Sequence, residues 1–278
     1  MQARWMQWML AAAVAAAGAA GCAAVRQQLG MALVPVETEV KLGAQLAEEV
    51  QQQQRVLADE ETQAYVAGIF APLVEASRRD RADLQYQVRV LDDREQVNAF
   101  ALPGGYIYVY TGLLLLADNE AEVAGVLAHE IGHVVARHSA NRLATQMGVS
   151  VLASVALGEQ PNVLAKLASD LAGASTMAAF SRDDEREADH YGLAYSMAAG
   201  YDPRGLETFF RKLLEQEGGH HRGTFEGLLA SHPATGERIA DLQKRILQAG
   251  DAGGRLEAER YGQARTHLWL YYQQNPAE

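Results

Sequence analysis

The stretch NEAEVAGVLAHEIGHVVARH, residues 119–138, has the apolar pattern of a core helix and contains two histidines four residues apart, His129 and His133. Four residues make slightly more than one helical turn, so both imidazoles lie on one face and can chelate a single metal ion. Glu130 lies about 100° further round the helix, where it can hold a water molecule and accept its proton. Zinc would supply the other half of this chemistry, because it lowers the pKa of its water to roughly 7.

This pattern is rarely produced by chance. With 8 His and 35 acidic residues in 278 positions, random placement gives about 0.03 copies of it. Two surface histidines are the weaker interpretation, because buried imidazoles without partners are costly and the neighbouring residues are apolar. Those neighbours are Val123, Val126, Leu127, Val134 and Val135. The sequence therefore predicts a zinc site with one ion per chain.

A catalytic zinc site uses three protein ligands and keeps one position open. Cys22 is the only cysteine, so the third ligand must be His, Asp or Glu. In the run SRDDEREAD, residues 181–189, Glu185 and Asp189 are four residues apart on one helical face. One of them can ligate zinc while the other hydrogen-bonds the far nitrogen of a ligating histidine. Glu187 points nearly opposite to them.

His138 follows His133 by five residues. On a straight helix it is about 140° from the chelating face, which predicts a structural or surface histidine.

The remaining chain predicts an α+β fold that is mostly helical. Two alternating segments, 84–91 and 97–110, predict a small antiparallel sheet with a turn at Pro103. The uncharged segment 143–158 is shorter than the roughly 20 apolar residues of a membrane span, which favours a buried helix. Helices are expected between 37 and 81, at 119–140, 142–157, 162–179, 182–199, 203–217 and 234–248, and after GDAGG at 250–254.

The strand just before the metal helix is a candidate substrate site. Residues 106–110, YIYVY, alternate, and an edge strand there could pair with an extended peptide through its main chain. Tyr106, Ile107 and Tyr108 are the residues predicted to bind substrate in this way. The alternative is an ordinary core strand with a tyrosine face.

Residues 1–22 have the order of a signal peptide, with Arg4 before an apolar stretch at 8–20. The segment AAGC at 19–22 resembles a bacterial lipobox, in which Cys22 is lipidated, although Ala19 stands where leucine is usual. An ordinary cleaved signal or an uncleaved anchor is the alternative.

The residue after Cys22 is Ala23 rather than aspartate, which favours an outer-membrane, periplasm-facing anchor. Residues 23–249 are then the metallopeptidase domain, and 250–278 a C-terminal helical extension. The formal net charge of −11 argues against a nucleic-acid partner. Nothing in the sequence sets the oligomeric state.

Four segments together resemble one metallopeptidase family, the one that contains the CAAX prenyl endopeptidases and the HtpX heat-shock proteases. They are NAFALPGGYIYVYTGLL at 98–114, NEAEVAGVLAHEIGHVVARH at 119–138, SRDDEREAD at 181–189 and SHPATGERIADL at 231–242. The chain is most similar to soluble periplasmic members such as the beta-barrel assembly-enhancing protease. The resemblance implies a zincin-like (gluzincin) fold and cleavage of unfolded or misfolded envelope proteins.

The same resemblance assigns roles to individual residues. It makes Glu185 the third zinc ligand and Asp189 an outer-shell partner or proton donor, and it favours substrate binding by the strand at 106–110. The chain departs from the barrel-assembly protease in its tail, since about 36 residues follow Leu242 where that protein has a long repeat array. Docking to the barrel-assembly machinery is therefore in doubt. The transmembrane helices of the membrane-embedded members are also missing, so prenyl-protein processing is not expected.

His232 lies in Ser231-His232-Pro233, where proline restricts the histidine to extended conformations and ends the preceding helix. From the residues alone it is a capping or surface histidine. The resemblance places it beside the zinc, where it can occupy the open position and suppress activity, or swing away and stabilise the tetrahedral intermediate.

Two other functions remain open. One is a holdase-like or latched quality-control lipoprotein with little peptidase activity. The other is a metal-buffering lipoprotein, for which His220 and His221 would be extra ligands, although flanking glycines make that pair a loop feature.

Overall fold

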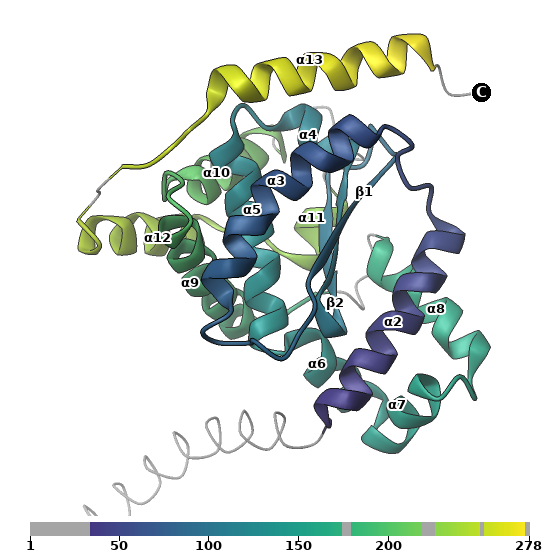
Figure 1. Cartoon of the computed structure of the whole chain (residues 1–278). Coiled ribbons are helices and arrows are strands. Elements are labelled where there is room, and N and C mark those ends of the chain that lie inside the picture. Colours follow the sequence, from purple (N-terminus) through teal and green to yellow (C-terminus); the bar gives the residue numbers. More distant parts are fainter. Residues whose placement is uncertain (1–33, 174–178, 218–225, 251–252, 276–278) are drawn as a thin grey trace, which may run out of the picture.

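The computed structural model describes residues 34–173, 179–217, 226–250 and 253–275. The predicted signal segment with Cys22, and the pair His220 and His221, lie outside these residues. The described chain is mostly helical, with helices packed on both sides of a three-stranded sheet (Figure 1). The predicted α+β class is confirmed.

The sheet consists of β1 (Gln87–Leu91), β2 (Ala99–Leu102) and β3 (Tyr106–Tyr110), in the order β1-β3-β2. β3 pairs antiparallel with β2 but parallel with β1. The sheet is therefore mixed, and the wholly antiparallel sheet predicted from sequence is wrong. Only β2 and β3 are joined by a tight turn, at Pro103–Gly105, and a tight turn is what enforces an antiparallel pair.

The central position of β3 also corrects the predicted substrate strand. Tyr106, Ile107 and Tyr108 pair with β1 on one side and β2 on the other, so β3 has no free main-chain edge. They are strand residues of the sheet centre, and a peptide cannot add to β3 by main-chain pairing. Strand order depends on contacts between distant segments, which an alternating sequence pattern does not reveal.

Alternation along the strands divides the core in two. Ile107 and Val109 pack with α3 (Glu60–Ser77) and α5 (Glu120–Val135), whereas Tyr108 and Tyr110 pack with apolar residues of α2 (Val36–Gln53) and α8 (Pro161–Ala172). In Figure 1 the sheet is seen between these two helical layers. β3 is therefore buried on both faces, and its Ile107 and Val109 share one core with the metal helix α5.

Two predicted helices are divided by residues with left-handed backbones. α5 ends at Val135, and α6 (His138–Met147) begins after Arg137, whose φ is 59°. α7 (Val149–Ala156) begins after Gly148, whose φ is 83°. Within the described residues no helix is long and apolar enough to span a membrane. The single buried helix predicted at 143–158 is wrong, because Gly148 divides it and the apolar side chains of Val151 and Leu157 are exposed.

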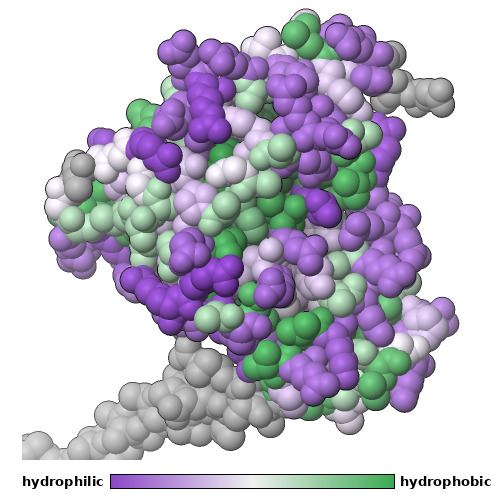
Figure 2. Space-filling model, in the orientation of Figure 1, coloured by the Kyte–Doolittle hydropathy of each residue, from purple (hydrophilic) through white to green (hydrophobic). Residues whose placement is uncertain are grey.

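The other helices complete the second half of the chain. They are α4 (Thr111–Leu116), α9 (Arg182–Ala198), α10 (Gly205–Glu217), α11 (Glu226–Ser231), α12 (Gly236–Gln248) and α13 (Ala258–Gln274). The C-terminal helix α13 buries Tyr261, Leu268 and Tyr272 in the same core as α3 and α5. Charged and polar side chains cover most of the face seen in Figure 2, with smaller apolar areas between them.

The packing of α5 against α9 depends on glycine. A Cβ atom on Gly132 would lie 2.8 Å from the carbonyl oxygen of Ala188, and one on Gly192 would lie 3.0 Å from the backbone nitrogen of His129. The two backbones therefore touch. This contact brings the acidic side chains of α9 beside the histidines of α5.

Gly132→Ala is expected to lower the free energy of unfolding by about 1–3 kcal/mol, because its methyl group would overlap the α9 backbone. Urea denaturation without metal measures this change. Gly68→Ala is the matched control: Gly68 also lies in a helix, but its Cβ would meet nothing within 4 Å. That control should stabilise the protein by about 0.5–1 kcal/mol through helix propensity. Equal stabilisation by both substitutions would contradict the close approach.

Candidate metal centre

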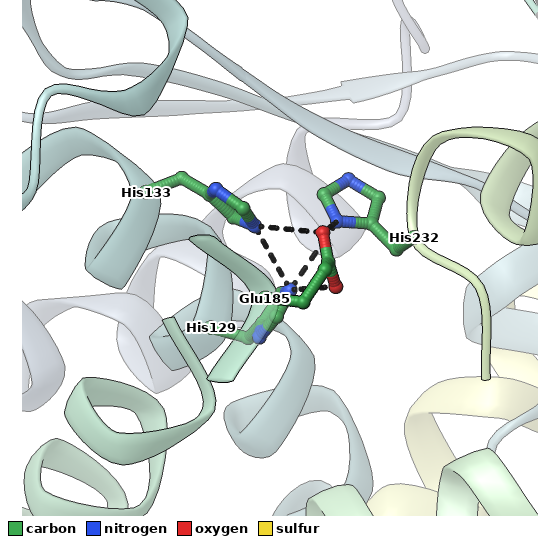
Figure 3. A group of neighbouring side chains, drawn as sticks. All are labelled: His129, His133, Glu185 and His232. Carbon is green, nitrogen blue, oxygen red and sulfur yellow. Dashed lines mark hydrogen bonds and ion pairs between the residues drawn. The ribbon is translucent and has the colours of Figure 1, made fainter. Parts of the chain in front are cut away.

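Four side chains from three segments converge on one point (Figure 3). His129 and His133 come from α5, Glu185 from α9, and His232 from the residue after α11. Their ligand atoms all lie within 4.8 Å of one another. The three predicted ligands and His232 are thus brought together.

The distances within this group match ligands facing one ion. The Nε2 atoms of His129 and His133 are 3.1 Å apart. The Nε2 atom of His133 lies 3.4 Å from Oε1 of Glu185, and that of His129 lies 3.5 Å from Oε2. Spacing by one helical turn makes this possible, because it points both imidazoles the same way.

The fourth member of the group, His232, comes from the segment after α11. Its backbone N–H donates to the carbonyl of Leu228 at 2.7 Å, which ends α11, and its Nδ1 lies 2.9 Å from Oε1 of Glu185 and 3.3 Å from Nε2 of His129. Three imidazole nitrogens and one carboxylate oxygen are a donor set that suits tetrahedral zinc. In this structure His232 lies beside the three predicted ligands, at the position from which it could fill the fourth place on the ion.

Burial provides a separate test of the metal fit. The exposed fractions of His129, His133, Glu185 and His232 are 2%, 0%, 2% and 1%. Among the described residues, neither carboxylate oxygen of the fully buried Glu130 has a hydrogen-bond partner. Buried carboxylates need partners, and a carboxylate beside a zinc site hydrogen-bonds to the water held there. Oε1 of Glu130 lies 3.6 Å from Nε2 of His232, beyond hydrogen-bond distance, so both oxygens are placed to hold such a water and fit a metal centre.

The two glutamates differ in their electrostatics. Burial raises the pKa of Glu130 above its ordinary value, which brings it nearer to that of an effective general base at neutral pH. Burial also acts on Glu185, but the charge of His232 and the hydrogen bonds from His129 and His133 outweigh it and hold the pKa of Glu185 well below normal. Glu185 is thus an ionised ligand, and Glu130 is the group suited to accept a proton.

Asp189 orients His129. Its Oδ1 atom lies 3.0 Å from Nδ1 of His129, the nitrogen that faces away from the ligand group. Burial raises the pKa of Asp189, but hydrogen bonds from Arg238 and His129 outweigh it and lower that pKa overall. An ionised carboxylate accepts hydrogen bonds, so this geometry supports the predicted outer-shell role and not proton donation.

Arg238 is a site residue that sequence reasoning missed. Its guanidinium holds both oxygens of Asp189, at 2.6 and 2.8 Å, and lies 2.6 Å from Oε2 of Glu185. The signal was present in α12, where Arg238 is four residues before the buried Leu242 on the same helical face. A buried arginine is rarely without an anionic partner.

Two further residues lie against His133, and sequence reasoning missed the contact of each with it. Phe180 stacks on the His133 ring with the centroids 4.0 Å apart, and its backbone N–H donates to the carbonyl of Ser231 at 3.2 Å. His138 is buried, and its Nδ1 lies 2.9 Å from Nδ1 of His133. His138 is thus the structural histidine that was one of its two predicted roles, and it is not in the ligand group. It lies closer to His133 than a straight helix would place it, because the left-handed Arg137 redirects the chain after α5.

Comparison with known proteins agrees with this geometry. The model of peptidase family M48 matches residues 60–246. The chain is 36% identical over 167 residues to the beta-barrel assembly-enhancing protease of Yersinia pestis, covering 57% of this chain and 34% of that protein. It is 31% identical over 188 residues to the mitochondrial metalloendopeptidase OMA1 of Schizosaccharomyces pombe, covering 68% and 54% respectively.

A third relative is the metalloprotease YcaL of Escherichia coli, which is 33% identical over 168 residues, covering 59% of this chain and 62% of that protein. The chain therefore spans less than two thirds of each of these relatives. The family match, however, covers more than half of the chain and contains every residue of the metal centre. The chain belongs to peptidase family M48, the metallopeptidase family that its motifs predict.

Proposed function

We propose that this protein is a zinc-dependent endopeptidase that cleaves unfolded or misfolded proteins of the bacterial envelope. The observation that carries the proposal is Glu130, a fully buried carboxylate without hydrogen-bond partners among the described residues, next to three ligands that fit zinc. Glu130 would take the proton of the attacking water, while Asp189 and Arg238 keep His129 and Glu185 in place.

The outer edge of β2, which pairs with no other strand of the described sheet, is the best candidate for peptide binding in place of β3. The carbonyl of Asn98 accepts from the N–H of Tyr110, so Asn98, Phe100 and Leu102 direct their main-chain groups to β3. Ala99 and Ala101 direct theirs to the other side. An extended peptide could pair there, and only an unfolded or flexible segment can present itself as an extended strand.

A resting, closed form would account for two features of the site. His232 stands in the ligand group, and the side chains of Ala99 and Ala101 are buried, with the hydroxyl of Ser139 donating to the carbonyl of Ala101 at 3.1 Å. Substrate would enter only after His232 and the segments near β2 move. The alternative function, a latched quality-control lipoprotein with little peptidase activity, is favoured by this same observation.

The proposed location is the periplasmic side of the outer membrane, through a lipid on Cys22. The support is the sequence AAGC at 19–22 behind an apolar segment, together with Ala23. The beta-barrel assembly-enhancing protease among the relatives is consistent with an envelope location.

Casein hydrolysis by the purified full chain tests the proposed activity. Hydrolysis should be lost after prolonged incubation with a chelator and should return when zinc is added back. Hydrolysis that survives proven removal of zinc would refute the zinc-dependent mechanism. Zinc binding without hydrolysis, for both the wild type and a variant lacking His232, would support the alternative instead.

His232→Ala is expected to raise casein hydrolysis if His232 acts as a latch, because it opens the fourth position of the ligand group. A stabilising role in the reaction predicts the opposite, a loss of roughly 10²- to 10³-fold in turnover. Initial rates must be compared at equal zinc loading. His190→Ala is the control, since His190 is an exposed histidine of α9. A rate equal to that of the wild type would exclude both roles.

A further inference from the structure

His138 is a buried histidine that the proposed chemistry does not use. It is the first residue of α6, is 6% exposed, and meets the His133 ring edge-on with the ring centroids 5.0 Å apart and the planes at 71°. The Nδ1 atoms of the two rings are 2.9 Å apart, a hydrogen-bond distance. One ring must donate and the other accept.

The position of the ligands settles which ring donates. The Nε2 atom of His133 faces His129 and Glu185, so this nitrogen must be unprotonated to bind zinc. The proton of the neutral His133 ring is then on Nδ1, which donates to Nδ1 of His138. His138 in turn carries its proton on Nε2, which lies 3.4 Å from Oε2 of Glu187 and 3.5 Å from Oδ1 of Asp184.

Two features of the fold hold His138 in this orientation. Arg137 turns the chain between α5 and α6 with a φ of 59°, a conformation that is uncommon for a residue with a side chain. Its guanidinium donates to Oε2 of the buried Glu39 at 2.9 Å and to the carbonyl of Val34. The turn that presents His138 is therefore fixed by two groups at the start of α2.

We propose that His138 is a positioning residue that accepts the Nδ1 proton of His133 and so fixes the imidazole of that zinc ligand. The two histidine ligands then have unequal partners. Nδ1 of His129 faces the carboxylate of Asp189 at 3.0 Å, whereas Nδ1 of His133 faces an imidazole nitrogen of His138. A carboxylate partner raises the basicity of a ligating histidine more than a neutral one does, so His129 is the stronger donor to the metal.

This inference rests on the proposed zinc site but not on the proposed substrate, and it is tested by zinc affinity. A competing chromophoric chelator measures zinc affinity for the full chain and its variants. The matched pair is His138→Asn and His138→Leu. Asparagine places an acceptor oxygen where histidine has Nδ1, and leucine has the same branching without an acceptor.

His138→Leu is expected to weaken zinc binding by roughly 10- to 100-fold, as for loss of an outer-shell partner, and His138→Asn should restore most of that affinity. His190→Leu, which replaces an exposed histidine, should bind zinc like the wild type. Thermal unfolding of each protein without zinc separates these losses from damage to the fold. Equal affinities for Leu and Asn at position 138, whether both normal or both weak, would overturn the acceptor role.

Nuclear magnetic resonance of zinc-loaded protein with ¹⁵N-labelled histidine gives a second readout. It uses the wild type, so it does not depend on whether a variant folds. The wild type should show a slowly exchanging Nδ1–H on His133, directly coupled to an acceptor nitrogen of His138. A His133 ring without a protonated Nδ1 would overturn the proposal. If the wild type binds zinc and shows this proton but cleaves no casein, the proposed peptidase function fails while the role of His138 stands.

Discussion

Glu130→Gln is expected to reduce casein hydrolysis by roughly 10²- to 10⁴-fold while zinc remains bound. Glutamine has the same shape as glutamate, and Glu130 is beside the ligands rather than among them, so the metal site should assemble normally. The amide cannot accept the proton of the attacking water. Burial raises the pKa of Glu130, which suits a group that takes up a proton during the reaction.

Three measurements on the same preparation give this result its meaning. Metal analysis must show one zinc per chain, circular dichroism must show an unchanged fold, and initial rates must be compared with those of the wild type at several protein concentrations. Near wild-type turnover with stoichiometric zinc would end the mechanism proposed for Glu130. Loss of both zinc and activity would show instead that Glu130 supports the metal site.

Glu185→Ala is expected to remove zinc almost completely, a larger effect than the roughly 10- to 100-fold loss typical of an outer-shell partner. It deletes the ionised ligand that both histidines of α5 face. It also takes one of two carboxylates from the buried Arg238, whose positive charge then lies near the ion without that compensation. Both changes act against a bound cation.

Zinc per chain after dialysis against a zinc buffer measures this effect. Asp183→Ala is the control: Asp183 is another acidic residue of α9, but its side chain is 93% exposed and pairs with Arg186 on the surface. That control should keep its zinc. A fully loaded Glu185→Ala protein would show that the ligand set is not the one assigned here.

The centre of the metal site was predictable because its geometry is local. Glu130, His129 and His133 lie within five consecutive residues, and helix geometry alone places them relative to one another. Glu185 and Asp189 share a second helix, so their common face follows from the same periodicity. The two helices can meet only through the close contacts at Gly132 and Gly192. A glycine in the sequence does not reveal which helix it will pack against, so this part was not predictable.

The parts that failed depend on single backbone conformations or on distant contacts. The contact of His138 with His133 was not foreseen because one left-handed residue, Arg137, redirects the chain, and an arginine in the sequence gives no signal of that conformation. β3 was expected at an edge, but its place between β1 and β2 is set by the order of strands in space. Arg238 joins Glu185 and Asp189 from a helix about 50 residues further along the chain.

Burial of the four ligand side chains also governs how the protein exchanges its metal with the surroundings. An ion that solvent does not reach can leave only during local opening, so the rate of release should follow the frequency of that opening rather than the strength of an external chelator. A ligand that binds only the closed form also makes opening rarer, by an amount set by its free concentration relative to its dissociation constant. The residence time of the ion and the rate of substrate entry would then share one kinetic step, the departure of His232 and its neighbours from the site.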